Sequence, residues 1–261
     1  MQHGDPARSV THISRAYPDR VEVRGRDLCG ELIGGVSFSQ YFYLLLMGKE
    51  PTEQQSFFLD ALLVAIAEHG MMPSNVAARM TLFADPDSLQ GAVAAGILGA
   101  GPVMLGTSEP CARLLAAAAA RVEAGEELTA VVLEEARAIH AAGGRLPGFG
   151  HPVHKQVDPR AERIFELADA RGVSGVHVEL ARAFRPAAAE VWGKPLPLNI
   201  SMPIAAVMLD LGFSAPAVKS VPILARTASL LAHLAEEREN PIGFAMAKEA
   251  EDSVDYRPPE S

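Results

Sequence analysis

The sequence predicts an all-α fold on three observations. Apolar residues recur at helical spacing along most of the chain, and no alternating β-branched segment occurs after residue 36. Glycine and proline separate the periodic segments, which is typical of helices joined by short loops. With 261 residues, of which 49% are hydrophobic and 21% charged, the chain has the composition of a packed globular protein.

The N-terminal part contains the one candidate for β structure, residues 21–29 (VEVRGRDLC), where a short strand pair is expected. Ser37 is a suitable N-cap for a first helix, which ends at Gly48. Thr52 is expected to cap a second helix. A third helix, rich in small residues and opened by an Asp-Pro pair, is expected over residues 85–98.

Six further segments have helical spacing. They cover residues 112–124, 129–142, 158–171, 175–191, 199–211 and 216–239. The first of them is rich in alanine, which has the highest helix propensity. The third opens with Asp158-Pro159, in agreement with the preference for proline in a first helical turn. The whole pattern amounts to about ten helices without an internal repeat.

The formal net charge of −9 argues against several classes of partner. Acidic side chains gather in short runs between apolar residues, as on solvated helix faces, and no basic surface for nucleic acid is evident. The longest apolar stretch, residues 92–105, is interrupted by glycine and proline and is too short to span a bilayer. Neither nucleic acid nor a membrane is therefore an expected partner.

Export and disulfide bonding are not expected either. Residues 1–20 contain no hydrophobic core of the kind that a secretory signal has. Cys29 and Cys111 are too few for a disulfide framework, and they lack metal-ligand spacing. The expected location is therefore the cytoplasm.

The most informative segment is residues 147–160, PGFGHPVHKQVDPR. Its glycines and prolines exclude a helix interior, and Pro152 favours an extended backbone at His151. A rigid loop that presents an imidazole beside Lys155 and Arg160 suits a site that polarises a carbonyl and holds carboxylates or phosphates. The alternative is an ordinary loop between helices in which His151 bonds a carbonyl.

This loop resembles the signature loop of the citrate synthase superfamily, and other segments match that family in the same order. Residues 37–52 (SFSQYFYLLLMGKEPT) resemble its early helix and turn, and the stretch from Glu68-His69 to Arg79 resembles its DHE…AAR segment. Three more segments, residues 101–109, 198–202 and 226–233, extend the resemblance over roughly residues 25 to 240.

The resemblance implies a large helical domain with a smaller helical domain inserted into it, and a site in the cleft between them. Residues 1–105 and 200–261 would form the large domain, and residues 106–199 the small one. It also implies a homodimer, with residues 91–106 as contributors to the interface. In size the chain is closer to citryl-CoA lyases than to full-length citrate synthases, which are longer at the N-terminus.

The resemblance also assigns roles to residues. His151 matches the histidine that hydrogen-bonds the keto oxygen, and Lys155 is a candidate for binding a phosphate of coenzyme A. His69, Arg160 and Arg226 match residues that bind the substrate, and bidentate pairing explains why arginine suits carboxylates. The implied ligands are a di- or tricarboxylate and a coenzyme A thioester, and no metal is implied. Taken singly, His69 is as well explained as a histidine at a helix end, and Lys155 and Arg160 as solvated charges.

The sequence departs from the family where protons are transferred. Met104 stands in place of a histidine, and methionine neither donates a useful hydrogen bond nor carries a charge. Ser201 stands in place of the aspartate base, and a neutral serine needs a relay to take up a proton. Ser229 and Leu230 replace a glycine and a tryptophan, and Arg257 is the nearest candidate for the arginine that citrate synthases contribute to the partner subunit. Ordinary citrate synthase activity is therefore not expected.

Three functions remain open. The first is a carbon–carbon lyase similar to citryl-CoA lyase, with His151 at the alkoxide and Ser201 or water protonating the enolate; it would convert citryl-CoA or a related acyl-CoA to acetyl-CoA and oxaloacetate or another keto acid. The second is a citrate synthase-like enzyme with a different acyl-CoA or keto acid. The third is a non-catalytic protein that binds a carboxylate or coenzyme A.

Overall fold

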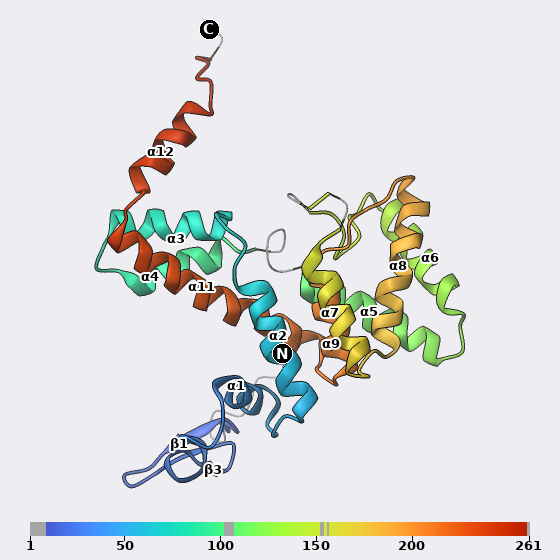
Figure 1. The fold of residues 1–261 in the computed structure, drawn as a ribbon, viewed down its shortest axis with the longest axis horizontal. Coiled ribbons are helices and arrows are strands. Elements are labelled where there is room, and N and C mark those ends of the chain that lie inside the picture. Colours follow the sequence, from blue (N-terminus) through green and yellow to red (C-terminus); the bar gives the residue numbers. More distant parts are fainter. Residues whose placement is uncertain (1–8, 102–106, 152–153, 156, 260–261) are drawn as a thin grey trace. The chain divides into compact units, whose positions relative to one another are not determined.

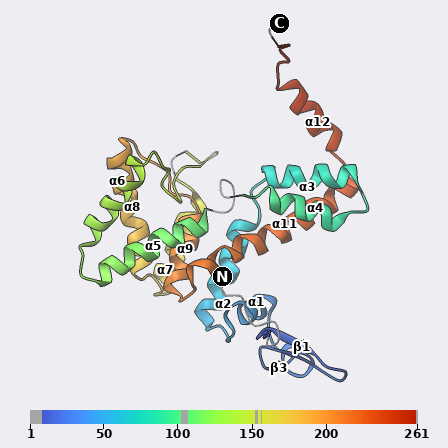
Figure 2. The same ribbon diagram turned by 180° about the vertical axis from the view of Figure 1, so that it is seen from behind.

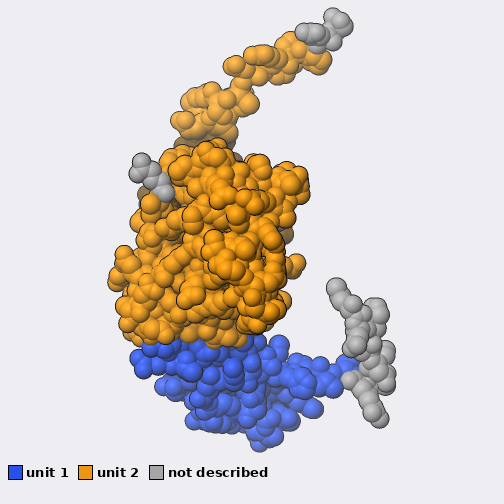
Figure 3. Space-filling model, turned by 90° about the vertical axis from the view of Figure 1, so that its right-hand side faces the viewer, with its two compact units in different colours: residues 1–60 blue, residues 61–261 orange. Residues whose placement is uncertain are grey.

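The structure, a computed structural model, describes residues 9–101, 107–151, 154–155, 157 and onward to 259. The chain forms two compact units, residues 1–60 and residues 61–261 (Figure 3). The described residues contain twelve α-helices and only three short strands, so the prediction of an all-α fold is confirmed. None of these helices has the length and apolar content that a membrane span requires.

The first unit begins with a small antiparallel sheet in the order β1-β2-β3. Its strands are β1, Ser14–Ala16, β2, Val21–Val23, and β3, Arg26–Asp27. The strand pair expected over residues 21–29 is therefore present. The sequence did not predict β1, because all three of its residues are exposed and it carries no apolar alternation.

Two helices follow with the predicted caps. They are α1, Phe38–Met47, and α2, Glu53–Ala67. The Ser37 hydroxyl accepts from the Gln40 amide at 3.3 Å, and the Gln40 side chain accepts from the Ser37 amide at 2.8 Å. Thr52 and Gln55 make the same exchange at 3.2 and 2.8 Å. Each pair is a capping box, which satisfies amides that a first helical turn leaves without partners.

In the second unit, one group of helices packs around Ala78, Ala92 and Leu230. The group consists of α3, Pro73–Ala84, α4, Leu89–Leu98, and α11, Ser220–Glu239, which lie side by side in both ribbon views (Figures 1 and 2). Gly96 permits the close approach of α4 to α11, because a Cβ at this position would lie 2.6 Å from a methyl group of Leu230. The last helix, α12, Gly243–Asp252, contacts α3.

A second group of helices contains α5, Ser108–Glu123, α6, Leu128–Ala141, α7, Pro159–Ala170, α8, Val176–Trp192, and α9, Ser201–Asp210. Helix α5 packs against α9, and α6 packs against α8. The short helix α10, Ala215–Val218, leads from this group toward α11. The boundaries of the large and small domains at residues 105 and 199 stay predictions.

Several helix boundaries differ from the sequence predictions. The helix expected over residues 85–98 begins only at Leu89, because Asp85 ends α3 and the next residues form a turn. The helix expected over residues 216–239 is two helices, α10 and α11. The sequence pattern did not predict α3, because the polar residues Asn75 and Arg79 occupy buried positions on it and obscure its apolar face.

Candidate active site

Three histidines, which we call the imidazole cluster, lie together in the second unit: His69, His151 and His154. The ring centroids are 5.0 Å apart for His69 and His151, 4.4 Å for His151 and His154, and 5.5 Å for His69 and His154. Arg160 extends from the first turn of α7 and places its Nη2 atom 3.4 Å from His151 Nε2. Residues that were selected from distant parts of the sequence are therefore neighbours here.

The signature loop is fixed to the segment before α9 by backbone hydrogen bonds. The Asn199 amide donates to the Gly148 carbonyl, and the Gly150 amide donates to the Pro197 carbonyl, both at 2.8 Å. The Asn199 side chain also donates to the Gly150 carbonyl at 2.9 Å. These bonds fix the backbone directly before His151, which explains why a loop of glycines and prolines can present a side chain in one place.

His151 is arranged as a neutral hydrogen-bond donor. Its Nδ1 accepts from the backbone amide of His154 at 2.9 Å, so that the proton of the neutral ring belongs on Nε2. Burial, together with His154, His69 and Arg160, lowers the pKa of His151 to about 4, against the opposing effect of Asp158. At neutral pH, His151 Nε2 and Arg160 Nη2 are thus two donors, and their 3.4 Å contact is not a hydrogen bond between them but an approach that a shared oxygen acceptor would bridge.

Arg160 is held by Asp158, which is fully buried and caps α7. The carboxylate accepts from Arg160 Nε at 3.0 Å and from Nη2 at 2.8 Å, and it also accepts from the Ile200 amide at 3.1 Å. Burial raises the pKa of Asp158, but the hydrogen bonds and charge of Arg160 outweigh it and hold the pKa below its usual value. The charge of Arg160 is therefore largely compensated within the protein.

Arg226 differs, because the described residues offer it no carboxylate partner. It lies on α11 with 4% of its surface exposed, and its two terminal nitrogens donate to the Asn75 side chain at 3.2 Å and the Ile66 carbonyl at 3.4 Å. Its Nε is buried without a hydrogen-bond partner among the described residues. Burial lowers the pKa of Arg226, which the charge of Glu68 opposes. A buried guanidinium without a direct ion pair is costly unless an anionic ligand pairs with it.

Glu68 supports the turn that carries His69. Its carboxylate accepts from the backbone amides of His69 at 2.8 Å and Gly70 at 2.6 Å, and from the hydroxyl of Ser229. His233 Nε2 lies 3.0 Å from the same carboxylate, so this histidine has a structural role in supporting the turn. Burial alone would raise the pKa of Glu68. The hydrogen bonds from Ser229 and from the backbone outweigh burial and hold the pKa below its usual value.

The remaining predicted site residues have other surroundings. Ser201 Oγ lies 2.6 Å from the hydroxyl of Thr107, and the Ser201 amide donates to Asn199, which links it to the signature loop. Lys155 is exposed, with its Nζ 3.5 Å from the His151 carbonyl. Met104 lies outside the residues that the structure describes.

The imidazole cluster is also the group of described residues that best meets the spacing of a metal site, with potential ligand atoms within 4.8 Å of one another. A metal-binding histidine normally donates its second N–H to an acceptor. His151 does the reverse, because its Nδ1 accepts an amide proton and its Nε2 carries the proton that a metal would have to replace. The arrangement therefore favours a carboxylate or carbonyl oxygen over a cation.

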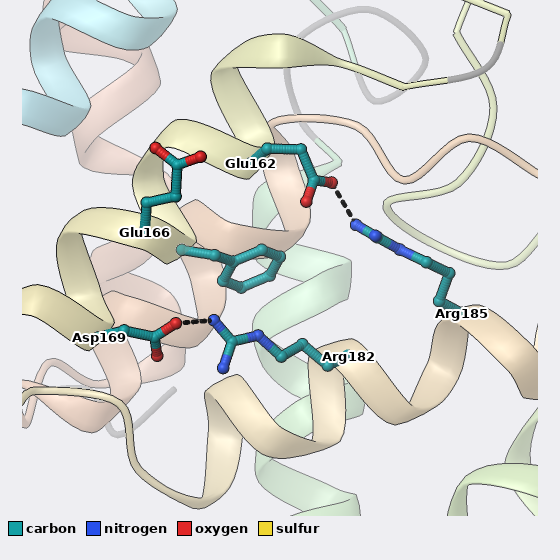
Figure 4. A pocket seen from close by; sticks show the side chains of 6 residues that line it. Glu162, Glu166, Asp169, Arg182 and Arg185 are labelled. Carbon is teal, nitrogen blue, oxygen red and sulfur yellow. Dashed lines mark hydrogen bonds and ion pairs between the residues drawn. The ribbon is translucent and has the colours of Figure 1, made fainter.

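A groove of about 390 Å³ lies elsewhere, lined by residues of α7 and α8 (Figure 4). Its charged groups are already paired: Arg182 bonds Asp169 at 2.6 Å and Arg185 bonds Glu162 at 2.5 Å. None of the predicted site residues lines this groove. It therefore offers less to an anionic ligand than the surroundings of Arg226.

Sequence reasoning missed three residues of this site. His154 follows His151 by three residues in the same loop, and the sequence analysis gave it no role. A second imidazole this near to His151 in the sequence was a usable signal. Glu68 was noted only as part of a motif. Asn75, which is fully buried beside Arg226, gave no signal, because a single asparagine in a helix has no pattern of its own.

Comparison with known proteins gives a consistent result. The sequence model described as "Citrate synthase, C-terminal domain" matches residues 14–243. A citrate synthase of Heyndrickxia coagulans is 28% identical over 209 residues, which cover 78% of this chain and 53% of that protein. The chain thus spans about half the length of such relatives.

Solved structures show the same similarity. The structure of citryl-CoA lyase from Hydrogenobacter thermophilus matches with a TM-score of 0.83 and 31% sequence identity, over 97% of this chain and 96% of that one. An ATP citrate lyase of Methanosaeta concilii, solved with (3S)-citryl-CoA, matches with a TM-score of 0.78 over 99% of this chain and 43% of that one. At 19% identity, the second match is evidence for the fold alone.

Proposed function

This chain belongs to the citrate synthase family, and on that premise we propose that it is a coenzyme A-thioester lyase that cleaves citryl-CoA, or a closely related 3-hydroxyacyl thioester, to acetyl-CoA and oxaloacetate or a similar keto acid. The observation that carries the proposal is the buried Arg226, which forms no ion pair with a carboxylate of the described residues and lies in the same unit as two adjacent donors, His151 Nε2 and Arg160 Nη2. Such an arrangement fits a substrate with carboxylates beside a hydroxyl. The end-to-end match with a citryl-CoA lyase supports the same assignment.

The proposed reaction breaks the bond between the hydroxyl-bearing carbon and the α-carbon of the thioester. The hydroxyl loses its proton, its oxygen becomes the keto oxygen, and the electron pair of the broken bond forms the enolate of acetyl-CoA. His151 and Arg160 donate hydrogen bonds to that oxygen while its charge develops. Arg226 holds a carboxylate of the keto acid.

Two proton transfers complete the cleavage. Asp158 and Glu68 are engaged by Arg160 and by Ser229, so the proposal assigns the hydroxyl proton to His69, whose Nε2 is buried without a partner among the described residues. The enolate carbon takes a proton from Ser201, which the Thr107 hydroxyl contacts, or from water. His69 then releases its proton to solvent, and Ser201, where it is the donor, regains a proton from water through the Thr107 hydroxyl, so the two transfers balance.

Purified protein incubated with citryl-CoA tests this function, with oxaloacetate release coupled to a dehydrogenase. We expect turnover in the wild type and in His140→Ala, which changes an exposed histidine packed on Trp192. We expect only residual turnover in His151→Ala. Equal rates for the wild type and His151→Ala would reject the proposal.

Two further experiments separate the two remaining functions. Binding of citrate or oxaloacetate in calorimetry without any turnover would identify a binding protein. Citrate formation that appears only when Ser201→Asp is combined with Met104→His would identify a synthase-like enzyme that lost its proton-transfer groups.

A further inference from the structure

Asn75 is buried to 0% exposure in the first turn of α3, and both ends of its amide are engaged. Its oxygen accepts from Arg226 Nη1 at 3.2 Å and from the Ser74 hydroxyl at 3.0 Å. Its nitrogen donates to the Gly70 carbonyl at 2.9 Å and lies 2.7 Å from His233 Nε2. One side chain thus contacts Arg226 and the turn directly after His69.

We propose that Asn75 is a positioning residue that sets the carboxylate affinity of the site, because its neutral amide orients Arg226 and the His69 turn without cancelling the charge of Arg226. The inference rests on the proposed function and deepens it. Arg160 provides the comparison within the same molecule. Its partner Asp158 is a carboxylate that occupies two guanidinium nitrogens, so its charge is compensated. Arg226 has an amide in the corresponding role and keeps its charge for a ligand.

The inference predicts that the isosteric change Asn75→Asp separates ligand binding from folding. A carboxylate about 3 Å from the guanidinium would form a buried ion pair and satisfy Arg226 internally. The ion pair should offset the loss of the hydrogen bond to the Gly70 carbonyl, so that the fold survives while carboxylate binding is lost. A merely structural asparagine predicts a different result, since the same change would lower stability while the folded variant would still bind carboxylates as the wild type does.

Calorimetry with oxaloacetate, citrate and free coenzyme A tests the inference. For Asn75→Asp we expect at least a 30-fold loss of affinity for both carboxylates and an unchanged affinity for coenzyme A. In turnover, KM for citryl-CoA should rise more than kcat falls. Arg226→Gln should show a similar loss, and the double variant should lose little more, because both changes remove the same charge. Thr81→Val, on the same helix, is the matched control and should bind as the wild type does.

Specific results would overturn the inference. Oxaloacetate affinity within 3-fold of the wild type in folded Asn75→Asp would do so, and so would a wild type that binds neither carboxylate. If Asn75→Asp does not fold, Asn75→Ala decides: it should bind oxaloacetate about 10-fold more weakly and coenzyme A as before, and equal oxaloacetate binding would overturn the inference. A wild type that binds carboxylates through Asn75 yet releases no oxaloacetate from citryl-CoA would reject the proposed function and leave this inference supported.

Discussion

Arg160 and Arg226 show how identical side chains acquire different properties from their neighbours. Asp158 neutralises Arg160 and fixes its orientation, whereas Arg226 is buried beside an amide and a carbonyl. The resemblance to a known family selected both arginines with His69 and His151, and the structure places all four in one unit. The resemblance could not reveal that Arg160 is ion-paired and Arg226 is not. That difference depends on Asp158 and Asn75, and the resemblance assigned no role to either residue.

The donor role of His151 makes a direct prediction for catalysis. His151→Ala should lower kcat/KM for citryl-CoA about 100- to 1000-fold, the usual cost of removing one donor to a developing oxyanion. His151→Gln keeps an N–H group and should lose less than His151→Ala. Steady-state oxaloacetate release measures both variants. If the two lose activity equally, a donor at this position is not what the reaction requires.

The low pKa of His151 makes a prediction for stability against pH. The unfolded chain takes up this proton near pH 6.5, whereas the folded protein resists it until about pH 4. As pH falls from 6.5 to 4, the unfolded state therefore binds more protons, and the free energy of unfolding decreases. Urea unfolding at pH 7 and pH 5 should show a smaller decrease for His151→Gln than for the wild type. Identical decreases would show that His151 titrates normally.

At the scale of elements, three cap residues were reliable signals, whereas the Asp-Pro pair at residue 85 was not. Ser37, Thr52 and Asp158 begin helices as predicted, since capping is decided by residues within one turn. The sequence did not predict helix α3, because two of its buried residues, Asn75 and Arg79, are polar. Contacts with α11, which lies far along the chain, explain why they are buried. Arg79 pairs with the buried Glu237 of α11 at 2.7 Å, a partner 158 residues away that no local pattern indicates.

The glycines of the signature loop allow a matched pair of substitutions. Gly148 has φ +77°, and a Cβ there would lie 2.9 Å from both Cys111 Sγ and Met202 Cβ. Gly150 has φ +86°, but no atom of the described residues lies within 4 Å of such a Cβ. Gly150→Ala should therefore lose only the left-handed backbone preference, about 1–2 kcal/mol of unfolding free energy. Gly148→Ala should lose about 1–3 kcal/mol more through overpacking. Urea unfolding compares the two, and equal losses would contradict the packing described for Gly148.

At the scale of the whole molecule, sequence predicts least. The all-α fold class follows from local periodicity, and the family follows from motifs that occur in the same order along the chain. Both predictions are confirmed. Domain limits and assembly depend on surfaces that only the packed chain defines. The expected interface segment, residues 91–106, illustrates this, because Ala92 and Gly96 are buried against α11 of the same chain and are not free for a partner.

The exposed end of that segment leads to a prediction about the oligomeric state. Leu98, at the end of α4, is 83% exposed, so the segment does present an apolar side chain that a two-fold partner could cover. If the chain is a homodimer through this segment, sedimentation should show twice the mass of one chain, and Leu98→Glu should shift the protein to the monomer, because a two-fold interface would place two added charges close together. Ile33→Glu, at a residue 68% exposed in the first unit, is the matched control and should leave the dimer intact. A wild type that sediments as a monomer, or a Leu98→Glu variant that stays dimeric, would remove this surface from the interface.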